Sequence, residues 1–182
     1  MRRLVPILLT AAALAGCGDE PESAAPDGAD AQRALAGSPP ALAALHRQAN
    51  QLIGGGDDAF RARLRALRGN PIVVNKWASW CPPCRDEFPV FQRVSVALGR
   101  EVAFLGVDSD DNDDDARAFL GRYPVSYPSY RDPEERVARV FKGHLAFPTT
   151  AFYDARGKLA FVHQGPYDSD AALRRDIEEY AR

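Results

Sequence analysis

The apolar residues of this chain follow two spacings, which together predict alternating strands and helices from residue 40 onward. Short continuous apolar runs such as Ile72-Val73-Val74 are typical of buried strands. Longer segments with apolar residues three or four positions apart predict amphipathic helices. The expected strands span residues 71–77, 102–107, 150–153 and 159–163. The expected helices span residues 40–53, 57–68, 83–98, 114–122, 132–141 and 168–181.

The last two expected strands are joined by the turn sequence Asp154-Ala155-Arg156-Gly157, which predicts an antiparallel hairpin. The segment 39–182 has the usual size of a single globular domain with one core. The sequence shows no internal repeat. We therefore expect one α/β domain.

The N-terminus has the parts of a secretory signal, because the charged residues Arg2 and Arg3 precede an apolar segment over residues 4–14. This segment is too short to span a bilayer. The residues Leu14-Ala15-Gly16-Cys17 resemble the lipobox of bacterial lipoproteins, in which the signal is cleaved before a cysteine that then carries lipid. The resemblance implies a signal peptide over residues 1–16 and lipidation of Cys17. An ordinary cleaved signal, with Cys17 as an incidental free thiol, is the alternative.

The segment after the signal is rich in Ala, Pro, Asp, Glu and Gly and has almost no large apolar residue. This composition predicts a disordered tether over residues 17–38. The apolar pattern then predicts an N-terminal helical extension over residues 39–69 and the main domain over residues 70–182.

The formal net charge of −2 gives no reason to expect a nucleic acid partner. Charge is concentrated in the acidic run 108–115, which contains Asn112. Its spacing does not match a calcium-binding loop, which would also need a glycine and a distal glutamate. We expect a solvated turn that caps the following helix.

Two cysteines separated by two residues, in Trp80-Cys81-Pro82-Pro83-Cys84, stand where an expected strand gives way to an expected helix. The free backbone N–H groups and the helix dipole at a helix N-terminus favour a thiolate. Cys81 is therefore the expected nucleophile, and Cys84, one turn later, can resolve a mixed disulfide. The two intervening prolines stiffen the turn and supply no N–H donor.

Three other roles for this cysteine pair remain open. A structural zinc site needs four ligands, whereas the histidines, His46, His144 and His163, are scattered singly. A permanent disulfide that closes so short a loop would constrain the unfolded chain little. Peroxide chemistry is harder to exclude, because any thiolate of low pKa can be oxidised to a sulfenic acid. No metal is expected.

The order of elements, the Trp80–Cys84 motif and the sequence Phe147-Pro148-Thr149 resemble thioredoxin. The resemblance covers most of residues 70–182 and implies a central mixed sheet with flanking helices. It also implies a cis peptide bond before Pro148, which would lie across from the cysteines, although a plain loop proline is the alternative. The residues that would contact an extended substrate chain are Trp80, Pro82, Pro83, Phe147, Pro148 and Thr149. A plain packing role for Trp80 is also open.

Within that superfamily, residues 73–89 look like the TlpA/ResA-like family of membrane-anchored thiol-disulfide oxidoreductases. Cytoplasmic thioredoxins have a buried aspartate at the position of Asn75, and asparagine cannot take its proton. The resemblance instead suggests Glu87 as an acid/base group, the alternative being a solvated glutamate in the first helical turn. Lys76 departs from the family, which more often has an aromatic residue there, and a buried ammonium needs a partner.

The resemblance implies a monomeric, lipid-anchored, extracytoplasmic thiol-disulfide oxidoreductase that uses Cys81 and Cys84 and needs no bound cofactor. Reduction of disulfides in exported proteins is the favoured direction, with apocytochrome c thiols as one possible substrate. Electrons would come from a membrane dithiol donor, since no flavin or nicotinamide fingerprint is present. The alternatives are a thiol peroxidase of the same superfamily, whose usual threonine and proline before the cysteine are missing here, and a non-catalytic copper-binding module.

Overall fold

The computed structural model describes residues 25–182. The expected signal peptide, Cys17 and the expected tether up to residue 24 lie outside the described residues. Within residues 25–182, no helix combines the length and apolar character needed to cross a membrane.

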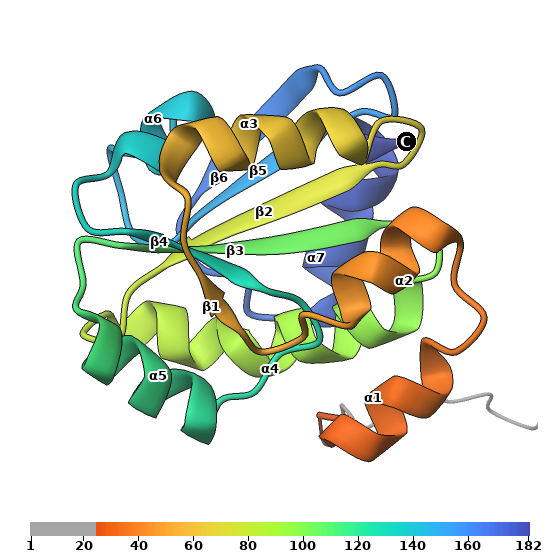
Figure 1. Cartoon of the computed structure of the whole chain (residues 1–182), viewed down its shortest axis with the longest axis horizontal. Coiled ribbons are helices and arrows are strands. Elements are labelled where there is room, and N and C mark those ends of the chain that lie inside the picture. Colours follow the sequence, from red (N-terminus) through yellow and green to blue (C-terminus); the bar gives the residue numbers. More distant parts are fainter. Residues whose placement is uncertain (1–24) are drawn as a thin grey trace, which may run out of the picture.

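One mixed sheet forms the centre of the molecule, with the strand order β1-β4-β3-β2-β5-β6 (Figure 1). Its strands are β1 (Leu52–Ile53), β2 (Ile72–Trp77), β3 (Ala103–Ser109), β4 (Ser129–Asp132), β5 (Thr149–Tyr153) and β6 (Leu159–Gln164). The first four strands pair in parallel, whereas β5 is antiparallel to β2 and β6 is antiparallel to β5. This is the expected thioredoxin-like arrangement with its C-terminal hairpin.

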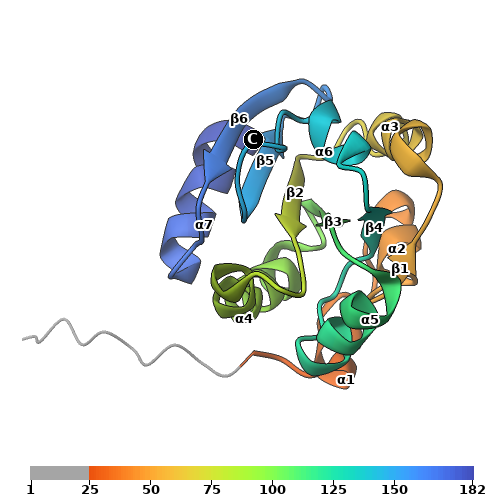
Figure 2. The same cartoon turned by 90° about the vertical axis from the view of Figure 1, so that its left-hand side faces the viewer.

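Helices cover both faces of the sheet, as Figures 1 and 2 show from two directions. One core cluster joins the sheet to α4, α5 and α7, and the other joins it to α2, α3 and α6. The helices are α1 (Gly28–Ala34), α2 (Pro40–His46), α3 (Gly56–Ala66), α4 (Pro82–Leu98), α5 (Asp113–Arg122), α6 (Arg136–Val140) and α7 (Asp170–Asp176), followed by the π-helical turn η1 (Ile177–Ala181). The central strands β2 and β3 are buried along their whole length, which explains their continuous apolar runs.

The prediction of one helix over residues 40–53 is wrong at its C-terminal end. Helix α2 ends at His46, and Asn50 has a positive φ of 58°. The Asn50 side chain bonds Leu120 O and Val125 N, so tertiary contacts replace the next helical turn. Leu52 and Ile53 then pair with β4, so the expected helical extension supplies an edge strand to the sheet.

Strand β4 was not predicted, and the helix expected over 132–141 begins only at Arg136. The four residues of β4 include two charged ones, and their strand conformation depends on pairing with β1 and β3. Asp132 ends this strand, and its carboxylate accepts hydrogen bonds from Val137 N and Ala138 N. Asp132 therefore binds free N–H groups at the start of α6 from the end of β4. The local sequence pattern does not predict this contact.

Helix α1 lies within the segment that was expected to be a disordered tether, and for this part the expectation is wrong. The Asp27 carboxylate caps the helix by accepting bonds from Ala29 N and Asp30 N. Gln92 of α4 donates a hydrogen bond to Pro26 O, and Ala31 and Leu35 are buried. A composition rich in alanine allowed a short helix that gains its order by packing on the domain.

Candidate active site

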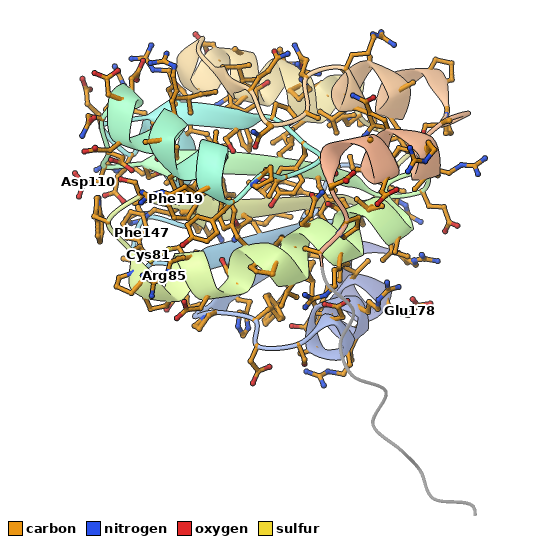
Figure 3. All side chains as sticks on the ribbon, turned by 90° about the horizontal axis from the view of Figure 1, so that it is seen from below. Cys81, Arg85, Asp110, Phe119, Phe147 and Glu178 are labelled. Carbon is orange, nitrogen blue, oxygen red and sulfur yellow. A yellow bond between two sulfur atoms is a disulfide. The ribbon has the colours of Figure 1, made fainter. Side chains whose placement is uncertain are left out.

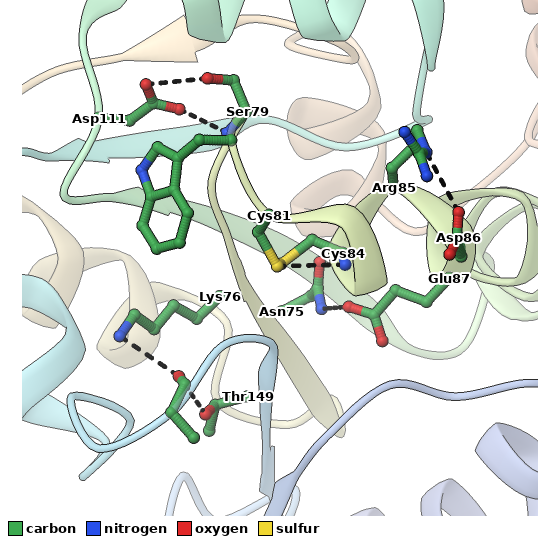
Figure 4. The surroundings of a disulfide bond; sticks show 12 residues. Asn75, Lys76, Ser79, Cys81, Cys84, Arg85, Asp86, Glu87, Asp111 and Thr149 are labelled. Carbon is green, nitrogen blue, oxygen red and sulfur yellow. Dashed lines mark hydrogen bonds and ion pairs between the residues drawn. A yellow bond between two sulfur atoms is a disulfide. The ribbon is translucent and has the colours of Figure 1, made fainter.

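The cysteine pair forms a disulfide at the carboxyl end of β2 and the first turn of α4 (Figure 4). Cys81 is the N-cap residue of α4, and its Sγ accepts a hydrogen bond from Cys84 N at 3.2 Å. Pro82 and Pro83 begin the helix without offering an N–H group. The free helix N-terminus is thus aimed at the Cys81 sulfur, where it can stabilise a thiolate.

Access distinguishes the two cysteines. Cys81 is only 3% exposed but lines a surface hollow of about 140 Å³ together with Trp80, Arg85 and Arg122, among others, whereas Cys84 is fully buried and does not line it. Cations near a cysteine favour its thiolate form. Sequence reasoning missed Arg122, which lies on α5 and reaches this hollow only through the tertiary fold.

Glu87 follows Cys84 by one helical turn and is fully buried, so the alternative of a solvated glutamate is wrong. Its Oε1 accepts a hydrogen bond from Asn75 Nδ2 at 2.7 Å, and its Oε2 accepts one from Tyr167 N at 3.1 Å. Burial raises the pKa of Glu87 from 4.5 to about 8, although these two hydrogen bonds oppose the shift. A carboxyl group with this pKa can give or take a proton near neutral pH.

Asn75 links β2 to this acid, and Figure 4 shows its hydrogen bond to Glu87. The Asn75 side chain is buried, and its Oδ1 has no hydrogen-bond partner among residues 25–182. An unpaired buried acceptor is costly. Glu87 and Cys84 are neighbours on one face of α4. Asn75 Oδ1 is therefore a candidate hydrogen-bond acceptor for a protonated group near the cysteines, such as the Cys84 thiol.

The loop before β5 completes the surface around the cysteines. The peptide bond between Phe147 and Pro148 is cis, which confirms the sequence prediction. The Phe147 ring packs edge-on against Trp80 with 4.8 Å between ring centroids, and Trp80 remains 52% exposed. Thr149 is buried and donates through Oγ1 to Ala146 O at 2.9 Å. Cys81, Phe147 and Asp110 lie at the same end of the molecule (Figure 3).

The predicted contact residues differ in exposure. Pro82 and Pro83 are exposed beside Cys81, and Phe147 is partly exposed, whereas Pro148 and Thr149 are buried. Trp80 and Phe147 therefore offer an apolar surface next to the reactive sulfur. Pro148 and Thr149 can contribute backbone and support to this surface.

An acidic cluster braces the residues just before Cys81. The Asp111 carboxylate accepts hydrogen bonds from Ser79 N and Ser79 Oγ, at 2.5 and 3.0 Å. Trp80 Nε1 donates to Asp110 O at 2.8 Å. Asp108, on the last part of β3, is buried, and burial together with the Asp111 carboxylate raises its pKa from 3.8 to about 9.

The prediction of a solvated turn over residues 108–115 is therefore wrong for Asp108 and correct at its other end. Asn112 caps α5 by accepting a hydrogen bond from Asp115 N, as expected. Asp108 belongs to β3 and lies in register with Trp77 of β2. The apolar run before Asp108 could have identified this residue. Such a run predicts a buried parallel strand, and binding and active sites form at the carboxyl ends of parallel strands.

Among residues 25–182, no group of three or more His, Cys, Asp and Glu side chains is arranged to hold a metal ion.

The family model described as "AhpC/TSA family" matches residues 47–162. The chain is 32% identical over 158 residues to the thiol:disulfide interchange protein DsbE of Xylella fastidiosa strain 9a5c, covering 85% of this chain and 71% of the relative. It is 38% identical over 108 residues to a DsbE homologue of Paracoccus denitrificans, covering 59% of this chain and 58% of the relative. A thiol-disulfide oxidoreductase ResA of Halalkalibacterium halodurans is 28% identical over 103 residues, 56% of this chain and 58% of the relative.

Two solved structures support the fold assignment. The structure of MTB dsbF has a TM-score of 0.58 and 33% identity, covering 63% of this chain and 84% of that protein. A thioredoxin-family thiol:disulfide interchange protein of Chlorobium tepidum also has a TM-score of 0.58, with 27% identity, covering 65% of this chain and 84% of that protein. Several curated relatives are covered over less than two thirds of their own length, as with the Paracoccus and Halalkalibacterium proteins at 58% each.

Proposed function

The chain belongs to the AhpC/TSA family, and from this premise we propose that it is a thiol-disulfide oxidoreductase that acts through Cys81 and Cys84. The main support is the disulfide at the start of α4. Its Cys81 lines a surface hollow, whereas its Cys84 is fully buried. The relatives named as thiol:disulfide interchange proteins support this assignment.

In the reducing direction, the Cys81 thiolate attacks one sulfur of a substrate disulfide. A mixed disulfide forms, and the other substrate sulfur leaves as a thiolate. Cys84, after losing its proton, attacks Cys81 Sγ and releases the second substrate thiolate. The substrate gains two electrons and two protons, and the protein is left with the Cys81–Cys84 disulfide.

Glu87 is the proposed acid/base group for the second step. Its position one turn after Cys84 and its pKa of about 8 suit it to accept the Cys84 proton and later release it. Asn75 Nδ2 donates a hydrogen bond to Glu87 Oε1, and Asn75 Oδ1 has no hydrogen-bond partner among residues 25–182. The Asn75 amide is therefore suited to connect Cys84 and Glu87 through hydrogen bonds. The proposed contact surface for the substrate consists of Trp80, Pro82, Pro83, Phe147, Pro148 and Thr149.

The proposed setting is the extracytoplasmic face of a membrane, with the chain anchored through lipid on Cys17. The support is the N-terminal sequence, whose signal-like residues precede that cysteine. Disulfides persist outside the cytoplasm, so the disulfides of exported proteins are the proposed substrates, that of apocytochrome c among them. A membrane dithiol donor would return two electrons to the Cys81–Cys84 disulfide.

The test is a comparison of two reactions of the full chain after reduction with dithiothreitol and removal of the excess. We expect rapid reduction of a peptide disulfide, with loss of the two protein thiols for each disulfide reduced. We expect no sustained consumption of hydrogen peroxide with dithiothreitol as donor. Peroxide turnover without disulfide reduction would favour the thiol peroxidase. Copper retained in stoichiometric amount after dialysis, without disulfide turnover, would favour the copper-binding module.

A further inference from the structure

Lys76 is a fully buried lysine on β2, one residue away from Asn75. Burying an ammonium group costs several kcal/mol unless its partners are well placed. A methionine or leucine would fill the same space in this buried strand without that cost. The contacts of the Lys76 ammonium group should therefore explain why this position has a lysine.

The ammonium group of Lys76 contacts two separate segments. Its Nζ lies 2.6 Å from Glu135 Oε1, just before α6. It also lies 3.4 Å from Ala146 O and 3.6 Å from the centroid of the Phe147 ring. Two of its three contacts are therefore with Ala146 and Phe147, the residues that precede Pro148.

This placement connects the strand that leads into the cysteines with the surface that faces a substrate. Phe147 packs against the exposed Trp80, which directly precedes Cys81. The Ala146 carbonyl also accepts the Thr149 hydroxyl, so the Lys76 bond adds a second restraint on this loop. In Figure 4 the Lys76 side chain extends toward the loop that leads to Thr149.

We propose that Lys76 is a positioning residue for substrate binding, which holds residues 146–148 and the Phe147 ring in the conformation that receives an extended polypeptide. This inference rests on the proposed function. The ammonium group of Lys76 interacts with the loop and with Glu135, and none of its hydrogen bonds or charge interactions in residues 25–182 involves Cys81 or Cys84. Its effect should therefore fall on the binding of polypeptide disulfides. Small disulfides, which need only the Cys81 sulfur, should react as before.

The test compares Lys76→Met with the wild-type full chain on two oxidants of the reduced protein. One is a peptide of about twenty residues with one internal disulfide, and the other is the small aromatic disulfide 5,5′-dithiobis(2-nitrobenzoate). We expect kcat/KM for the peptide to fall about tenfold, mainly through KM. The rate with the small disulfide, and the equilibrium constant with glutathione, should stay within about twofold of wild type.

Two further variants make the result specific. Lys76→Arg keeps a cation over the ring and should recover most of the peptide activity. Lys158→Met removes an exposed lysine in the hairpin and should leave both reactions unchanged. If Lys76→Met does not fold, Lys76→Met combined with Glu135→Gln removes both charges and is expected to show the same selective loss.

Equal losses on the two oxidants, or an unchanged KM for the peptide, would overturn the inference while leaving the proposed function intact. Failure of Lys76→Arg to recover activity would also overturn it, since a role in packing alone would then suffice. A wild-type protein that reduces neither oxidant would overturn the proposed function, and the inference with it.

Discussion

Asn75 and Lys76 are neighbours on β2, but they serve opposite faces of the sheet and bury polarity in different ways. Asn75 offers a neutral amide to Glu87, an acid whose pKa is raised so that it can change its protonation state near neutral pH. Lys76 places a full charge against Glu135 and the loop before Pro148. The proposed proton transfer and the proposed positioning of the loop therefore lie on opposite faces of one strand, with the cysteines following its carboxyl end.

Cys84→Ser removes the residue that completes the reaction without changing either face of β2. Cys81 should still attack a substrate disulfide, but the mixed disulfide cannot be resolved. We expect turnover to be abolished and a covalent complex between Cys81 and a peptide substrate to accumulate, visible by mass spectrometry under non-reducing conditions. Cys81→Ser should form no such complex. A complex in the Cys81→Ser protein would assign the nucleophile to Cys84 instead.

Glu87→Gln tests the Asn75 face. The amide keeps the shape of the side chain but cannot take a proton, so resolution by Cys84 should slow about 100-fold. The wild-type rate should rise with pH through about 8, where Glu87 loses its proton, and this inflection should be missing in the variant. Stopped-flow measurement of the second step gives both results.

Asp86→Asn is the matched control for Glu87→Gln, because Asp86 is the adjacent acid and its side chain is 68% exposed. Its pH profile should match that of the wild type. An inflection near pH 8 that survives in Glu87→Gln would show that another group handles the proton.

On the Lys76 face, we expect the loss of Glu135 and the loss of Lys76 to lower the free energy of unfolding by different amounts. Glu135→Gln leaves a fully buried ammonium without its carboxylate and should cost about 3–5 kcal/mol. Lys76→Met leaves a carboxylate that is 25% exposed and can bind water, so it should cost only about 1–2 kcal/mol. Urea unfolding of the oxidised proteins measures both values. Equal costs would show that the pair is not held in a buried setting.

The two buried acids also predict a dependence of stability on pH. Glu87 and Asp108 have pKa values raised to about 8 and about 9, so the folded state holds their protons at pH values where the unfolded state has lost them. Their contribution to stability is complete below about pH 4 and is lost as pH rises toward 9. The free energy of unfolding should fall with pH between about 5 and 9, by up to about 1.4 kcal/mol per unit for each proton.

Glu87→Gln should reduce this slope, and Asp86→Asn should leave it unchanged. A stability that rises over the same interval would contradict the raised pKa values of the two acids.

The sequence was most informative where a local pattern coincided with a tertiary role. The apolar run of β2, the cysteine pair and the proline at 148 placed the centre of the site, and the cis bond followed from the resemblance. The burial of Asp108 and the partner of Lys76 could not be predicted, because each depends on elements far apart in the chain. Strand β4 was missed for the same reason, since its pairing with β1 and β3 supplies what its short sequence lacks.

The reducing role of the cysteine pair can be tested by equilibrating the full chain in glutathione and dithiothreitol redox buffers and then trapping the free thiols. We expect one reversible two-electron transition of Cys81 and Cys84, with a potential at or below about −250 mV, as for a reductant supplied by a dithiol donor. A potential near −120 mV would contradict the reducing role and indicate a disulfide-forming oxidant. A pair that stays oxidised in every buffer would contradict thiol-disulfide exchange itself.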